Sequence, residues 1–145
     1  MPARISLSDL VDAYLWASAT GPYENAAYVT LASGRIWLVS DFDDAGEEPP
    51  EDVEDESLHA RVPTQAELDL GRTLALRFAQ ERLPERHEEV RRIFAGAGAY
   101  GRFKSLLDAG GHLEAWYAYE TQGVEHALRR WAARNGIELL ESGAA

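Results

Sequence analysis

The chain has 145 residues, 46% of them hydrophobic, no cysteine, and a formal net charge of −11. This length suffices for one domain with its own core, and the lack of cysteine excludes disulfides, thiolate metal sites and a cysteine nucleophile. Because the sequence shows neither a signal peptide nor an apolar run of the ~18 residues that span a membrane, we expect a cytoplasmic protein without a membrane partner.

The first predicted element is a helix over residues 6–18. Its apolar residues recur at helical spacing and predict one buried stripe, formed by Leu7, Leu10, Val11, Tyr14 and Leu15. Ser6 is the expected N-cap, and Gly21-Pro22 ends the helix.

A β-hairpin is predicted next. Residues 25–32 and 35–40 are rich in β-branched and aromatic residues, and Ser33-Gly34 between them is the expected two-residue turn. A lone hairpin is marginally stable in water, so another element must cover or extend it. Residues 58–62 are the predicted third strand, and residues 137–140 are a candidate final strand that would close the sheet.

Residues 41–56 (DFDDAGEEPPEDVEDE), named here the acidic segment, carry ten of the twenty-five acidic residues of the chain and no basic residue. We predict a flexible loop, because its charges repel one another and it has little to bury. Two interpretations stay open: a solvated linker, or a docking segment for a partner with a basic surface. The candidate partner-binding residues are Asp41, Asp43, Asp44, Glu47, Glu48, Glu51, Asp52, Glu54, Asp55 and Glu56.

The apolar period becomes helical from Thr64 onward. Thr64 and Glu67 match a capping box, and the helix is predicted to reach residue 83 with its apolar side on Leu70, Leu74 and Phe78. Further helices are predicted over residues 85–95, over residues 100–109, and from residue 113 to about residue 134, the last with a break or kink near its central glycine. Their aromatic residues, including Trp116 and Trp131, are expected in a core.

Three partial motifs do not predict a catalytic or metal site. Residues 96–101 read G-x-G-x-x-G, but they follow a helix, whereas the dinucleotide-binding motif follows a strand. The start of the acidic segment resembles a calcium loop without its spacing or its flanking helix. His87 and Glu88 begin H-E-x-x-H, but Arg91 replaces the second histidine. We therefore expect no metal and no cofactor, and we assign no catalytic residue.

An alternative site lies at the helix that starts near Tyr100. Its glycine-bounded N-terminus with nearby cations would suit a phosphate, and its aromatic residues would suit the wall of a small-ligand pocket. The competing interpretation is a plain helix–helix connector beside a packed core. The candidate ligand-binding residues are Tyr100, Arg102, Lys104, Trp116, Tyr117 and Glu120.

Four stretches resemble a bacterial family described as Uncharacterised Protein Family zero-one-five-eight. They are LDLGRTLALRFAQERLP (residues 68–84), GAYGRFKSLL (98–107), LEAWYAYE (113–120) and ALRRWAARNGIEL (127–139). The N-terminal helix and the hairpin are similar too, and the acidic segment is the least similar part. That family has no established activity, cofactor or catalytic residue, so the resemblance implies a bacterial protein and no particular function.

Together these elements predict an α+β fold with a single domain: an N-terminal helix, a small antiparallel sheet built on the hairpin, and a C-terminal helical layer. The leading interpretation is a non-enzymatic cytosolic protein-interaction module with an acidic loop. The alternative is a small-ligand or phosphate-binding protein, an enzyme included, at the helix near Tyr100. The arginines alternate with glutamates along the helices and form no basic patch, so nucleic acid is not an expected partner.

Overall fold

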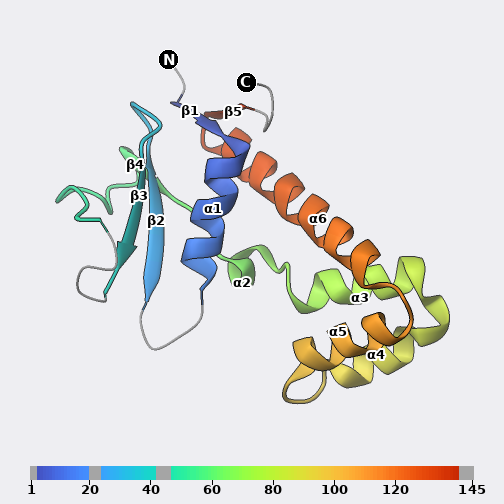
Figure 1. Cartoon of the computed structure of the whole chain (residues 1–145). Helices are drawn as coiled ribbons and strands as arrows, with labels where there is room; N and C mark the ends of the chain where they lie inside the picture. The colour runs from blue at the N-terminus through green and yellow to red at the C-terminus, as the bar shows by residue number, and fades with distance from the viewer. Residues whose placement is uncertain (1–2, 20–23, 42–46, 141–145) are drawn as a thin grey trace. The chain divides into compact units, whose positions relative to one another are not determined.

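The computed structural model describes residues 3–19, 24–41 and 47–140 (Figure 1). Its contacts divide the chain into two compact units, Met1–Leu68 with Glu125–Ala145, and Asp69–Val124. An N-terminal helix, a small antiparallel sheet and a series of C-terminal helices are all present, which confirms the predicted α+β class.

The first unit combines a helix with two small sheets. Its elements are β1 (Ala3–Ser6), α1 (Leu7–Ser18), β2 (Asn25–Thr30), β3 (Ile36–Ser40), β4 (His59–Arg61), the single turn α2 (Gln65–Leu68) and β5 (Ile137–Leu140). The second unit is helical and contains α3 (Arg72–Arg82), the 3₁₀ turn η1 (Pro84–Arg86), α4 (His87–Ile93) and α5 (Ala99–Ala109). Helix α6 (Leu113–Arg134) contributes residues to both units.

The predicted hairpin and its third strand are confirmed. β2 pairs antiparallel with β3 on one side and with β4 on the other, so the strand order is β3-β2-β4. Ala27 and Val29 of β2 are fully buried, and α1 packs against this strand (Figure 1). The turn is longer than the predicted two residues, because pairing stops where the Thr30 N–H donates to the Arg35 carbonyl and residues 31–34 form the loop.

The prediction that residues 137–140 close this sheet is wrong. They form β5, but β5 pairs in parallel with β1, from Ala3↔Ile137 to Ser6↔Leu140. β1 was not predicted because its apolar–polar alternation covers only four residues, which run directly into α1. The two strands join the ends of the described chain into one small sheet.

Helix α1 begins as predicted, but its buried face differs from the predicted stripe. The Ser6 hydroxyl accepts a hydrogen bond from the Asp9 N–H at 3.0 Å, which confirms the N-cap. Leu15 is 57% exposed, whereas Ala13 and Ala17 are buried. Small alanines allow a close approach to a neighbouring element, and ranking residues by hydrophobicity alone overlooks them.

The predicted helix over residues 64–83 is interrupted. Both hydrogen bonds of the capping box between Thr64 and Glu67 form, but α2 ends at Leu68 and Asp69 adopts a φ of 55° before α3 begins. Aspartate tolerates this left-handed conformation better than most residues.

The predicted break near Gly123 is absent, because α6 is continuous through this residue. A Cβ at Gly123 would lie 3.1 Å from Leu74 Cδ1, so the glycine serves close packing against α3.

The core of the second unit is aromatic. Trp116 is fully buried, and its ring meets Phe78 and Phe103 edge-on at centroid distances of 5.4 and 5.0 Å. Leu70, Leu74 and Phe78 are buried as predicted. Trp131, in the first unit, is 9% exposed, so the burial predicted for both tryptophans is confirmed.

Replacing Trp116 with alanine should lower the free energy of unfolding by about 3–5 kcal/mol, because a large cavity would replace its aromatic contacts. Urea denaturation measures this change. Tyr117→Ala is the matched control, since Tyr117 is the next residue of the same helix and is 43% exposed. An equally small loss in both variants would show that the indole is not a core residue.

Gly34 allows the hairpin loop to approach β1 closely. Its φ is +81°, and a Cβ at this position would lie 2.7 Å from the backbone oxygen of Arg4. Gly34→Ala should therefore destabilise the chain by about 1–3 kcal/mol, through strain and through displacement of β1.

Gly101→Ala is the matched control for this thermal-denaturation experiment. Gly101 lies within α5, where no atom would contact the added methyl group, so alanine should be neutral or stabilising by up to ~1 kcal/mol. A Gly34→Ala variant as stable as the native chain would contradict the close approach to β1.

Candidate functional site

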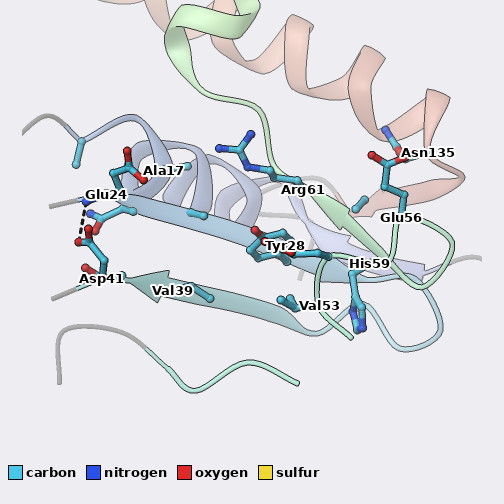
Figure 2. A pocket seen from close by; sticks show the side chains of 16 residues that line it. Ala17, Glu24, Tyr28, Val39, Asp41, Val53, Glu56, His59, Arg61 and Asn135 are labelled. Atoms are coloured by element: carbon cyan, nitrogen blue, oxygen red, sulfur yellow. Dashed lines mark hydrogen bonds between the residues drawn. The ribbon is translucent and has the colours of Figure 1, made fainter. Parts of the chain in front are cut away.

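A cavity of about 1210 Å³ lies in the first unit, next to the three-stranded sheet (Figure 2). Glu24 and Asp41 lie at one end of the cavity and Glu56 and His59 at the other, with Tyr28 between them. Both the sheet and the acidic segment therefore contribute to its wall.

Strand alternation explains which sheet residues face the cavity. Successive side chains of a strand point to opposite faces of the sheet, and cross-strand partners share a face. Tyr28 is paired with Arg61 of β4, and its near neighbour Ala26 is paired with Val39 of β3. All four line the cavity, on the face opposite to the buried Ala27 and Val29.

The wall of the cavity carries an excess of negative charge. Among the described residues that line it, four are carboxylates and one, Arg61, is a lysine or arginine. Arg61 has its own partner, since its guanidinium lies 3.8 Å from the Glu67 carboxylate. The four carboxylates are Glu24, Asp41, Glu54 and Glu56.

At one end of the cavity the Asp41 carboxylate is held by the backbone of Glu24. The Glu24 N–H donates to Asp41 Oδ1 at 2.8 Å, and the Asp41 N–H donates to the Glu24 carbonyl at 3.1 Å (Figure 2). This reciprocal pair extends the β2–β3 ladder and fixes Asp41, the first residue of the acidic segment, at the cavity.

His59 fixes the second half of the acidic segment. It is 6% exposed and uses both ring nitrogens: Nε2 lies 2.9 Å from Asp52 Oδ1, and Nδ1 lies 3.0 Å from Thr30 Oγ1. The Trp37 indole donates to the same Thr30 oxygen at 3.0 Å. The Thr30 oxygen therefore accepts from the indole and also bonds the imidazole, and the direction of the two His59 hydrogen bonds follows from the tautomer of its ring.

This order of hydroxyl, imidazole and carboxylate also occurs in hydrolases, but here it positions a loop. Thr30 is not among the residues that line the cavity, and its oxygen is occupied by Trp37. Sequence reasoning missed the network because Thr30 and Asp52 lie 29 and 7 residues from His59. A histidine within an apolar strand is the one signal that could have revealed it.

Short turns shape the acidic segment between Pro50 and Ser57. The Val53 N–H donates to the Pro50 carbonyl and the Asp55 N–H to the Asp52 carbonyl, at 3.1 and 2.8 Å. The Ser57 hydroxyl and N–H donate to the Asp55 carboxylate, and these hydrogen bonds lower the pKa of Asp55. The flexibility of the segment stays a prediction.

The ten candidate partner-binding residues thus have different positions. Asp43 and Asp44 lie outside the described residues. Asp41, Glu54 and Glu56 line the cavity. Glu47, Asp52 and Asp55 make hydrogen bonds within the protein, and Glu48 and Glu51 are exposed.

Five of the six candidate ligand-binding residues cluster in the second unit. The Tyr100 hydroxyl donates a short hydrogen bond to Glu120, and the Tyr100 ring lies 6.4 Å from that of Trp116. Lys104 Nζ lies 5.0 and 5.4 Å from the ring centroids of Tyr100 and Tyr117. Arg102, the sixth candidate, is exposed, and its guanidinium lies beside Gly96.

The chemistry of this cluster favours a protonated tyrosine. Burial, and then the hydrogen bond and negative charge of Glu120, raise the pKa of Tyr100. The buried Trp116 indole N–H interacts weakly with the Tyr100 hydroxyl, but it makes no hydrogen bond of good geometry with any described residue. The cavity described above includes none of these residues, and the neighbouring glycines connect α4 to α5 as the competing interpretation predicted.

Within residues 3–19, 24–41 and 47–140, no three histidine or acidic side chains come together in a way that could hold a metal ion. Over the same residues, no helix is both long and apolar enough to cross a bilayer.

Comparison with known proteins gives no relative for the chain: no family model, no curated protein and no solved structure matches it. Membership of Uncharacterised Protein Family zero-one-five-eight therefore stays a prediction.

The raised pKa of Tyr100 predicts a loss of stability at alkaline pH. In the unfolded chain tyrosine ionises near pH ~10, whereas folded Tyr100 stays protonated above it, so the unfolded state gains relative stability as the pH rises past ~10. Tyr100→Phe should flatten this decline, as measured by urea denaturation between neutral pH and pH ~11. Tyr28→Phe is the control, and an unchanged pH profile for Tyr100→Phe would contradict the prediction.

Proposed function

We propose that the chain is a non-enzymatic protein-interaction module whose acidic cavity binds a basic segment of a partner. The observation that carries the proposal is the wall of the cavity, where four carboxylates, Glu24 and three from the acidic segment, outnumber the single arginine. An electrostatic surface of one sign steers and selects partners of the opposite sign. The absence of cysteine from the sequence suits a cytoplasmic setting, which we include in the proposal.

The apolar part of the cavity suits the stems of lysine and arginine side chains. Tyr28, Val39 and Val53 lie between its two acidic ends (Figure 2). Long basic side chains pack their methylene stems on apolar surface while their charged ends reach polar groups, and a tyrosine ring attracts a cation. A partner segment with several basic residues could therefore use the floor and the rim of the cavity together.

We rank the ligand-binding alternative at Tyr100 second. In its favour, Lys104 lies over two tyrosine rings and Tyr100 has a raised pKa. Against it, Glu120 engages the Tyr100 hydroxyl and Arg102 lies apart from the cluster. A phosphate bound at Tyr100 would therefore lie next to the negatively charged Glu120, whereas the ligand-binding alternative requires a positively charged group at this position.

The charge-neutralising variant Glu54→Gln/Glu56→Gln should weaken binding of a basic peptide by at least ~10-fold, because it removes two of the four cavity carboxylates. The probe is a ten-residue peptide of alternating Lys and Thr, with affinity measured by fluorescence anisotropy. Raising the salt from low to physiological concentration should weaken binding by the native chain, since exposed charges are screened.

The matched control is Glu48→Gln/Glu51→Gln. These residues belong to the same segment and are exposed, but they do not line the cavity, so the net charge changes equally at a different place. We expect the control to lose much less affinity. Equal losses would show that diffuse charge, and not the cavity, attracts the peptide, and a native chain that does not bind would refute the proposed function.

A further inference from the structure

Strand β3 forms an edge of the three-stranded sheet, and the hydrogen bonds show which of its residues face outward. The Thr30 N–H bonds the Arg35 carbonyl and the Asp41 N–H bonds the Glu24 carbonyl, so residues 35, 37, 39 and 41 direct their backbone groups toward β2. In an antiparallel pair this direction alternates. Ile36, Leu38 and Ser40 therefore direct their N–H and C=O groups away from the sheet.

Glu47, from the acidic segment, occupies the middle of this edge. Its N–H donates to the Leu38 carbonyl at 2.6 Å, and its Oε1 accepts from the Leu38 N–H at 3.1 Å. Its other carboxylate oxygen lies 3.4 Å from the Arg35 guanidinium, which stacks 3.8 Å above the Trp37 ring. One glutamate thus satisfies both outward groups of Leu38.

These are the two backbone groups through which a neighbouring strand would pair with Leu38. An uncovered edge strand invites the addition of another chain, and proteins often protect such edges with charged residues. The Glu47 and Arg35 side chains are 44% and 57% exposed, and ion pairs in such positions contribute at most ~1 kcal/mol. An incoming strand could therefore displace Glu47 at low cost.

We propose that the edge of β3 is a strand-addition site for an extended basic segment of a partner, and that Glu47 covers this site until the segment displaces it. Strand addition supplies affinity through the backbone and specificity through alternate side chains. The proposal deepens the proposed function, on which its preference for basic residues rests.

The geometry of an added strand links this edge to the acidic cavity. Residues paired with Val39 would project from the same face of the sheet as Val39, which lines the cavity together with Asp41. Every second side chain of the added segment would then point toward the cavity carboxylates. A second copy of this chain fits poorly, since each copy carries a formal net charge of −11.

Amide hydrogen exchange followed by NMR tests the proposal, with the alternating Lys–Thr peptide as ligand and a Gln–Thr peptide as its neutral counterpart. At saturation the basic peptide should slow exchange at Ile36 by at least ~10-fold, because its outward N–H gains a partner. Exchange at Trp37, whose N–H already faces β2, should not change.

The variant Glu47→Ala tests whether the Glu47 carboxylate protects the outward N–H of Leu38. Without its carboxylate the Leu38 N–H should exchange faster in the free protein, and the basic peptide should restore its protection. Glu48→Ala, the exposed neighbour, is the matched control and should leave Leu38 unchanged.

The outcomes separate the two proposals. Protection of Ile36 and Leu38 by the basic peptide alone supports both. Binding of the basic peptide without protection at Ile36 overturns strand addition and leaves the cavity as the binding site. Equal protection by the neutral peptide supports strand addition and refutes the preference for basic partners. If neither peptide binds, or if mixing produces only self-association of the protein, both proposals are overturned.

Discussion

The hydrogen bonds of His59 are the constraint on which the candidate site depends. A buried imidazole with an unpaired nitrogen would cost about 1–3 kcal/mol, so both nitrogens need partners. One partner is Thr30 of the neighbouring strand, and the other is Asp52 of the acidic segment. The hydrogen bond between His59 and Asp52 therefore holds this part of the acidic segment against the sheet. As a result, Glu54 and Glu56 lie at the cavity.

This constraint also explains how residues 47–56, which carry seven carboxylates, are held against the sheet. Repulsion between like charges favours an extended, solvated chain, and screening weakens that repulsion only in part. The Asp55 carboxylate accepts a hydrogen bond from the Ser57 hydroxyl. The Glu47 carboxylate accepts a hydrogen bond from the Leu38 N–H and forms an ion pair with Arg35. The other carboxylates of residues 47–56 are exposed, and two of them, Glu54 and Glu56, line the cavity.

The sequence predicted most elements of the fold and few of its long-range pairings. Local patterns are sufficient for the N-cap of α1, the capping box at Thr64, the β2–β3 hairpin and the buried Trp116. They did not reveal β1, because only β5, more than 130 residues away, makes those four residues a strand. Composition pointed to three of the four cavity carboxylates, Asp41, Glu54 and Glu56, but not to Glu24, which lies outside the acidic segment. The cavity was missed because strand pairing and one histidine, neither visible in local spacing, bring its walls together.

At the edge of β3 an acidic residue, Glu47, covers the exposed side of an edge strand. A carboxylate that covers an edge strand opposes association of the protein with itself, because a second copy would bring further negative charge to the same place. If the edge accepts a strand as we propose, the same carboxylate would favour basic strands over neutral ones, because the displaced Glu47 would lie next to the incoming chain and could pair with it. Protection against aggregation and selection of a partner would then be two consequences of one residue, and the low cost of displacing an exposed ion pair would make the edge accessible to a partner.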